Sequence, residues 1–289
     1  MGWPKLPARL PSTPSAAGPG GTRTASPVSD PEPHLPPTPP RLSLVLPCYN
    51  GARYLGETLP TLFDWLARHD DTLGPVQVLL ADDGSTDGTA QAAAATGLPV
   101  EVVRLPVNRG KGAAVREGMR RATGRFRVFM DADLPFELQV LERVVHYLDF
   151  KEFDVVVGSR APRGDSYTVQ RPTARRWSSF IFSEFVGRLV VTGVRDTQCG
   201  IKGFRADVAD YLFREARVDR FAFDVELLYL AFKNNFDVKT LPVRILDERP
   251  STLQVMRDGW PMLLEVVRLP MRFHSGGYRM FAGRDRDPV

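Results

Sequence analysis

The chain has 289 residues, enough for one large α/β domain or two small ones with a sizeable core. Hydrophobic residues make up 43% and charged residues 25%, which is ordinary for a soluble globular protein. The net charge of +4 permits an anionic partner without requiring one. No basic run with interleaved aromatic residues indicates nucleic-acid binding, so we expect no nucleic acid among the partners.

Neither a secretory leader nor a membrane span is expected, because the chain has no apolar leader segment and no uncharged apolar run of about 18 residues. Cys48 and Cys199 are far apart in the sequence and have no histidine at metal-ligand spacing. They are expected to be buried free thiols in a reducing compartment rather than a disulfide.

Three regions differ in composition. Residues 1–40 are rich in Pro, Ser, Thr, Gly and Ala, with too few apolar residues for a core, which predicts a disordered Pro-rich tail. Residues 41–250 are expected to form the main domain. Residues 251–289 are expected to form an amphipathic helix with a frayed end.

Short apolar runs alternate with helical patterns in the first part of the domain. Strands are predicted at 42–47, 76–81, 100–105, 126–130 and 155–158, with helices at 54–68, after 89, and at 111–122 and 136–148. Strands that alternate with helices of about 12 residues favour a mostly parallel sheet covered by helices. The pattern weakens after Arg160, where a second half begins.

The predicted strand at 126–130 is followed by two carboxylates, Asp131 and Asp133. If the strand continued through them, both side chains would lie on one side, with the small Ala132 opposite. Such a pair suits Mg²⁺ or Mn²⁺, which take one or two protein carboxylates and leave substrate phosphates to complete the shell. A solvated strand end or a helix cap is the alternative, so the other loops must decide.

Three further loops follow predicted strands, at 47–51, 82–89 and 108–112. The first acids of the second loop are placed to accept hydrogen bonds from a base or a ribose, while its Gly and Ser residues permit close backbone approach. The alternative is a capped helix start. In the third loop, Arg109 and Lys111 alternate with glycines at a helix N-terminus, which favours a diphosphate site. The loop lacks the spacing of a P-loop, so a nucleoside triphosphatase is disfavoured.

The order of these loops resembles the inverting family 2 glycosyltransferases with the GT-A fold. The motifs are Pro-Cys-Tyr-Asn, Asp-Asp-Gly-Ser-Thr-Asp-Gly-Thr, Asn-Arg-Gly-Lys-Gly and Asp-Ala-Asp, and the resemblance covers about residues 41–250. Asn50-Gly51 departs from the usual Asn-Glu of that family. The resemblance implies Mg²⁺ or Mn²⁺ at Asp131 and Asp133. It also implies a nucleotide sugar bound by Pro47, Tyr49, Asn50, Asp82, Asp83, Gly84, Arg109, Lys111, Asp131 and Ala132.

The second half is dense in arginine, whose planar fork matches phosphate. If a helix starts near Thr173, Arg175 and Ser179 share one face; a solvated basic face is the alternative. Segments 196–205 and 221–226 resemble the polyprenyl-phosphate glycosyltransferases, the dolichyl-phosphate glucosyltransferase branch in particular. That resemblance implies that Arg160, Arg175 and Ser179 bind the lipid phosphate.

The expected reaction is transfer of glucose from UDP-glucose to a polyprenyl phosphate, with inversion. An acceptor phosphate monoester is largely dianionic near pH 7 and needs no general base, whereas a sugar hydroxyl does. Catalysis then reduces to alignment and to charge stabilisation of the leaving diphosphate by the metal at Asp133, with Lys111 or Arg109. One alternative is a soluble family 2 enzyme acting on a glycan hydroxyl, with Asp224 as base. Another is a nucleotidyltransferase or a non-catalytic nucleotide-sugar-binding protein.

A C-terminal apolar face suggests where the chain meets lipid. Its members share one side of the expected helix, with Arg268 and Arg272 nearby to meet lipid phosphates: Trp260, Leu263, Leu264, Val267 and Met271. Partial burial in the core is the alternative. The expected location is cytoplasmic and peripheral, at the inner face of the cell membrane.

Overall fold

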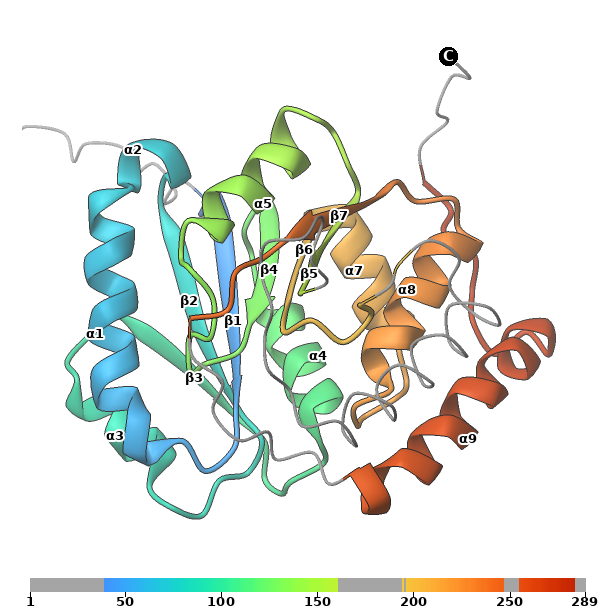
Figure 1. Cartoon of the computed structure of the whole chain (residues 1–289), viewed down its shortest axis with the longest axis horizontal. Helices are drawn as coiled ribbons and strands as arrows, with labels where there is room; N and C mark the ends of the chain where they lie inside the picture. The colour runs from blue at the N-terminus through green and yellow to red at the C-terminus, as the bar shows by residue number, and fades with distance from the viewer. Residues whose placement is uncertain (1–38, 161–193, 195, 247–254, 284–289) are drawn as a thin grey trace, which may run out of the picture. The chain divides into compact units, whose positions relative to one another are not determined.

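One sheet organises the part of the chain that the structure describes. This structure is a computed structural model that describes residues 39–160, 194, 196–246 and 255–283 (Figure 1). The strand order is β3-β2-β1-β4-β6-β5-β7. The strands are β1 Leu42–Cys48, β2 Val76–Asp82, β3 Val100–Arg104, β4 Phe126–Met130, β5 Val155–Ser159, β6 Ile201–Arg205 and β7 Val238–Pro242.

The expected mostly parallel sheet is confirmed, with one exception. Strands β3, β2, β1 and β4 are mutually parallel, and so are β5 and β7. Strand β6 runs antiparallel to both of its neighbours, β4 and β5. Because Met130 pairs with Ile201, the residues that precede β6 reach the same sheet edge as the carboxyl ends of β1 to β4.

Helices cover both faces of this sheet. Helices α1, α2, α3 and α5 contribute to one core cluster, and α4, α7, α8 and α9 to the other. In Figure 1, α1 and α3 lie on one side of the strands and α4, α7 and α8 on the other. The helices are α1 Ala52–Arg68, α2 Asp70–Leu73, α3 Thr89–Ala95, α4 Lys111–Arg121, α5 Val140–Asp149, α7 Ala206–Glu215, α8 Phe223–Lys233 and α9 Val255–His274.

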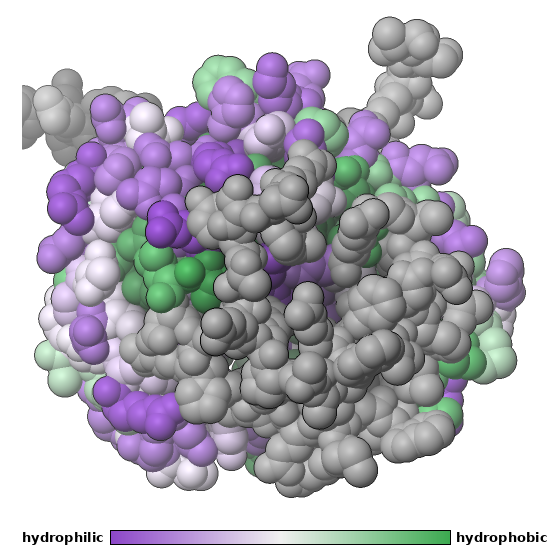
Figure 2. All heavy atoms as spheres, viewed as in Figure 1, coloured by the Kyte–Doolittle hydropathy of each residue, from purple (hydrophilic) through white to green (hydrophobic). Residues whose placement is uncertain are grey.

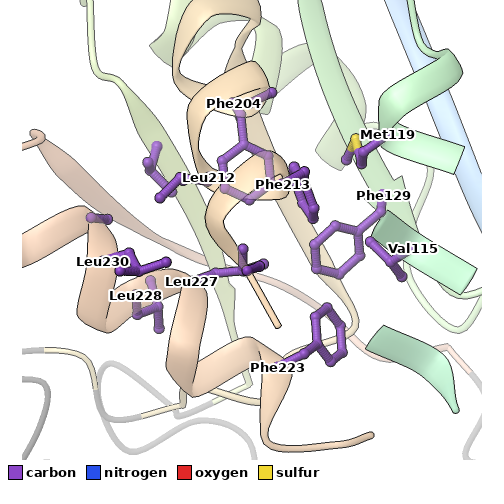
Figure 3. Packing of buried hydrophobic residues seen from close by; sticks show 14 of the residues in the cluster. Val115, Met119, Phe129, Phe204, Leu212, Phe213, Phe223, Leu227, Leu228 and Leu230 are labelled. Atoms are coloured by element: carbon purple, nitrogen blue, oxygen red, sulfur yellow. The ribbon is translucent and has the colours of Figure 1, made fainter. Parts of the chain in front are cut away.

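The apolar runs of the sequence become strands that are buried on both faces, as expected for a helix-covered sheet. In β4, Val128 packs in the α1 and α5 cluster, whereas its neighbour Phe129 packs in the α4 and α8 cluster. Figure 3 shows the second cluster, where the rings of Phe129 and Phe223 have centroids 5.8 Å apart. Burial of such side chains contributes about 1.5–3 kcal/mol each to the stability of the folded state.

One predicted boundary is wrong, because the helix expected from residue 136 begins only at Val140. Strand β4 spans Phe126–Met130 as predicted, so it does not continue through Asp131 and Asp133. Instead, the amide of Leu134 donates to the carbonyl of Asp131 at 3.1 Å, and Leu134 has a φ of 51°. A turn, rather than strand alternation, therefore orients the two carboxylates.

The chain after helix α9 hydrogen-bonds to α7 and to Asn234 at the end of α8. The Tyr211 hydroxyl donates to the Arg279 carbonyl at 2.8 Å, and the amide of Arg279 donates to Glu215 at 2.9 Å. Among the described residues, no helix is long and apolar enough to cross a membrane.

Candidate functional site

The loops after β1 and β2 lie against each other at the carboxyl edge of the sheet. The amide of Asn50 donates to Ser85 Oγ at 2.8 Å, and its side-chain carbonyl accepts from the amide of Thr86 at 3.0 Å. The amide of Gly51 donates to Thr89 Oγ1 at 2.9 Å. The two loops therefore meet at this edge of the sheet, and Asn50 takes part in holding them together.

Gly51, which departs from the family pattern, has a steric reason to be glycine. A Cβ at this position would lie 2.3 Å from Cys48 Sγ and 2.7 Å from the hydroxyl of Tyr54. Of the other predicted contacts in this loop, Pro47 pairs with Ala81 inside the sheet, and Tyr49 is exposed.

Asp82 and Asp83 have different roles in the loop after β2. Asp82 is fully buried, and its Oδ1 accepts from the amide of Ser85 at 2.9 Å. Its Oδ2 lies 3.4 Å from Arg104 Nε and has no hydrogen-bond partner among the described residues. A buried acceptor without a donor is costly, so Asp82 Oδ2 suits an N–H group of a ligand.

Asp83 is hydrogen-bonded to the loop that carries Arg109 and Lys111, the two side chains expected to bind a diphosphate. Its Oδ1 and Oδ2 accept from the amides of Arg109 and Gly110, both at 2.8 Å. Burial raises the pKa of Asp83, and these two amide donors act against that rise. Gly84 lets the two loops touch, because a Cβ there would lie 2.5 Å from the carbonyl carbon of Val107.

A cation already lies on one of the two predicted metal-binding carboxylates. Lys111 Nζ donates to Asp131 Oδ1 at 2.5 Å. Burial lowers the pKa of Lys111, but the carboxylates of Asp131 and Asp224 outweigh it and the net shift is upward. On the other side, the amide of Asp131 donates to the Gly200 carbonyl, and a Cβ on Gly200 would lie 2.0 Å from Asp131 Oδ2.

Asp133 lies close enough to the same region to act on Tyr54. The pKa of Tyr54 is raised first by burial, then by Cys48, and further by the negative charges of Asp133 and Asp131. Ala132 between them is buried. Two carboxylates that share a region, one of them already attracting an ammonium, fit Mg²⁺ or Mn²⁺ with ligand oxygens completing the shell. Within the described ranges, no group of three or more His, Cys, Asp or Glu side chains forms a complete protein cage.

Two further ion pairs belong to the second half. Arg160 donates through Nε and Nη2 to the two carboxylate oxygens of Asp196, both at 2.8 Å. Lys202 Nζ lies 2.6 Å from Asp224 Oδ1 and 3.0 Å from the carbonyl of Cys199. Figure 2 shows hydrophilic surface at the centre of one face, over the strands labelled β5 and β6 in Figure 1.

The environment of Asp224 differs from that of an exposed carboxylate. Asp224 is only 4% exposed, and Lys202 is fully buried. Burial raises the pKa of Asp224, while the ammonium groups of Lys202 and Lys111 act in the opposite direction. The predicted residues Arg175 and Ser179 lie outside the described residues.

Sequence reasoning did not single out Gly200, Lys202 or Asp219, all of which contact predicted site residues. Gly200 and Lys202 lie in segment 196–205, which the sequence analysis identified by its resemblance to a family without giving either residue a role. Asp219 lies just outside the segment 221–226 that the sequence analysis identified. Its contacts with Arg109 and Ala113, more than 100 residues earlier in the chain, connect it to the site.

Comparisons with known proteins agree on the family and the fold. Residues 43–213 match the model of "Glycosyl transferase family 2". The dolichyl-phosphate beta-glucosyltransferase of Dictyostelium discoideum is 31% identical over 250 residues, which cover 83% of this chain and 76% of the relative. The Homo sapiens enzyme of the same name is 29% identical over 252 residues, which cover 83% and 78%.

Among solved structures, glucosyl-3-phosphoglycerate synthase from Mycobacterium tuberculosis, in complex with Mn²⁺, UDP and phosphoglyceric acid, matches with a TM-score of 0.57. It is 19% identical, and the match covers 82% of this chain and 79% of that one. Mannosyl-3-phosphoglycerate synthase from Rubrobacter xylanophilus has a TM-score of 0.53 at 20% identity and covers 86% and 79%. These structures share the GT-A fold with this chain.

Proposed function

Because this chain belongs to the family 2 glycosyltransferases, we propose that it transfers glucose from UDP-glucose to a polyprenyl phosphate, with inversion and with Mg²⁺ or Mn²⁺. The arrangement that carries the proposal is the shared edge of β1, β2 and β4, where buried Asp82 and the Lys111–Asp131 pair lie. The relatives that are 31% and 29% identical to this chain are named dolichyl-phosphate beta-glucosyltransferases. Solved neighbours hold UDP with Mn²⁺ or Mg²⁺.

On this proposal, Asp82 selects the base of the donor. Its Oδ2 is buried and has no hydrogen-bond donor within the described part of the chain, so an imide N–H such as that of uracil completes its bonding. Arg104 holds the same loop through the Ser85 carbonyl, at 2.8 Å. Pro47, Tyr49, Asn50, Ala132 and the Asp83–Gly84 turn are proposed to line the remainder of the nucleotide-sugar site.

Asp131 and Asp133 are proposed to hold the divalent cation, which supplies positive charge to the leaving diphosphate. Lys111 now lies on Asp131 and has a second carboxylate, Asp224, acting on it. The Lys111 ammonium group can therefore move from Asp131 towards the diphosphate while it stays near the carboxylate of Asp224. Arg109, whose side chain is 51% exposed, is proposed as the second cation for the diphosphate.

The acceptor side favours a phosphate nucleophile. Asp196 fixes the guanidinium of Arg160 by two parallel hydrogen bonds, which aligns a group suited to phosphate. Asp224, the candidate base for a hydroxyl acceptor, is buried and ion-paired with Lys202. A phosphate dianion needs no general base, so the ion pair between Asp224 and Lys202 does not hinder the proposed reaction. Arg175 and Ser179 remain proposed phosphate ligands.

The test is incubation of radiolabelled UDP-glucose with a polyprenyl phosphate and Mg²⁺. We expect an organic-extractable glucosyl lipid with a β linkage and release of UDP. Failure with every common sugar nucleotide would refute the proposal, and release of pyrophosphate would indicate nucleotidyl transfer instead. Asp224→Asn separates the two acceptor classes, because only a hydroxyl acceptor predicts loss of the chemical step together with normal UDP binding.

We also propose that α9 contacts the cytoplasmic face of a membrane. Leu264, Val267 and Met271 are 51%, 47% and 60% exposed at helical spacing, while Val266 and Leu269 pack in the core. Arg268 lies beside the exposed residues and suits lipid phosphates. The side chains of Trp260 and Leu263, which the sequence places on this face, lie outside the described residues.

Sedimentation with vesicles that contain anionic lipid tests this contact. The triple variant Leu264→Glu, Val267→Glu and Met271→Glu should lose most vesicle binding while it keeps UDP binding. Phe150→Glu, at a residue 69% exposed outside α9, is the matched control and should bind like the unmodified protein. Equal binding by the triple variant would refute the proposed membrane face.

A further inference from the structure

The loop 216–222, between α7 and α8, lies directly against the loop that carries Arg109 and Lys111. The carbonyl of Asp219 accepts from the amide of Ala113 at 3.0 Å. A Cβ on Gly110 would lie 2.6 Å from that same carbonyl oxygen, and a Cβ on Gly112 would lie 2.6 Å from the carbonyl of Val218. The two backbones are therefore in contact, and both glycines are required for it.

The side chain of Asp219 joins two arginines. Its Oδ2 accepts from Arg109 Nε at 3.2 Å and from Arg109 Nη2 at 2.8 Å, and its Oδ1 is paired with Arg116. Burial acts to raise the pKa of Asp219, but the hydrogen bonds from Arg116 and Arg109 outweigh it and the pKa is lowered. The carboxylate is therefore ionised at neutral pH, and the three groups together keep a net positive charge.

The orientation of the Arg109 guanidinium depends on its contact with the Asp219 carboxylate. Its backbone is fixed by Asp83, but its guanidinium is half-exposed, and the described side-chain contacts place it on Asp219. A long exposed side chain without such a partner samples several rotamers, and ordering it on binding costs affinity. Asp219 removes much of that cost before a ligand arrives.

A second carboxylate fixes the loop itself. Glu226 is fully buried in α8 and accepts from the amides of Arg217 and Val218 at 2.8–3.0 Å. It also accepts from the Tyr278 hydroxyl at 2.7 Å, from the segment after α9. Burial raises the pKa of Glu226, and its donors oppose the rise. These bonds hold residues 217–218 in place next to Asp219.

We propose that Asp219 is a positioning residue for the nucleotide-sugar donor: it orients the Arg109 guanidinium so that its remaining donor groups meet the diphosphate. The inference rests on the proposed function, in which Arg109 binds that diphosphate. It assigns a role in donor binding to the α7–α8 loop, which carries none of the motifs of the first half.

The test is a double-mutant cycle on UDP binding and on the KM for the sugar nucleotide. Asp219→Asn should weaken UDP binding and raise the donor KM about tenfold, the loss expected for one misplaced charge-assisted hydrogen bond, and leave the acceptor KM unchanged. Asp219→Glu should recover part of the affinity. Because Asp219 acts through Arg109, Asp219→Asn added to Arg109→Gln should cause no further loss.

Asp210→Asn is the matched control, since Asp210 forms a comparable ion pair with Arg127 at 2.6 Å and none with the 108–112 loop. It should leave the donor KM unchanged. Unchanged or tighter UDP binding by Asp219→Asn, or fully additive effects in the cycle, would overturn the inference. If the unmodified protein makes no glucosyl lipid, the proposed function fails; if it does and only the cycle is additive, the positioning role fails alone.

Discussion

The two halves of the sheet edge are held together by different forces. On the β1 and β2 side, the candidate groups follow parallel strands directly, and backbone amides bond to side-chain oxygens of Asn50, Asp83 and Asp87. On the β6 side, the strand is antiparallel and side-chain ion pairs join Arg160 to Asp196 and Lys202 to Asp224. Hydrogen bonds between neighbouring loops follow from the strand order, whereas these ion pairs require that segments distant in the sequence meet.

The largest expected effect is at Asp131, which follows β4 between the two sides. Asp131→Asn should lower the rate of glucosyl transfer on the order of 10³-fold, because it removes one of the two carboxylates proposed to bind the divalent cation. That cation stabilises the leaving diphosphate. It should also abolish the rise in melting temperature that Mn²⁺ with UDP gives the unmodified protein. Asp64→Asn, at an exposed residue of α1, is the control. A loss below about tenfold would show that Asp131 is not at the reacting edge.

Lys202→Met tests the second side. It leaves the carboxylate of Asp224 buried without its cation, which should lower the free energy of unfolding by about 3–5 kcal/mol in urea titrations. The double variant Lys202→Met and Asp224→Leu should regain most of that stability, since no buried charge remains. If the double variant is as unstable as the single one, packing rather than charge pairing holds this side together.

A pair of glycine variants sharpens the contrast between site and core. In Gly200→Ala the new Cβ displaces the carboxylate of Asp131, so Mn²⁺ affinity and transfer rate should fall about 10–100-fold. In Gly118→Ala the new Cβ lies 2.5 Å from Val45 Cγ1 in the core. That variant should lose about 1–3 kcal/mol of stability with little change in Mn²⁺ affinity. Equal effects of the two variants on Mn²⁺ affinity would contradict the contact seen at Gly200.

The smallest expected effect concerns the two thiols, one on each side. Burial, as the main cause, raises the pKa of Cys48 to about 11 and that of Cys199 to about 12. A raised pKa keeps the neutral thiol, so alkylation by iodoacetamide at pH 8 should be slow in the folded protein and accelerate as pH approaches 11. Mass spectrometry after timed labelling measures this, with urea-unfolded protein as control. Rapid labelling of folded protein at pH 8 would contradict the burial of the labelled thiol.

The sequence by itself determined the strands of the first half and the loops that follow them. Apolar runs such as 126–130 are buried on both faces wherever they lie in a helix-covered sheet, so their length and spacing predict strands. Because β1 to β4 are parallel, the loops after them must share an edge. For that reason Asp82 and Asp131, which follow β2 and β4, lie at the same edge of the sheet. The order of the motifs along the chain indicated the family.

Only the tertiary structure decided how those groups are held. The turn at Asp131 follows the point where β4 stops pairing with β6, at Met130 and Ile201, and this turn orients the two carboxylates. Gly200 lies on Asp131, and Asp219 on Arg109, from positions 69 and 110 residues further along the chain. Local periodicity carries no information about such contacts, since they depend on the antiparallel path of β6 and on the packing of α7 and α8 beside α4.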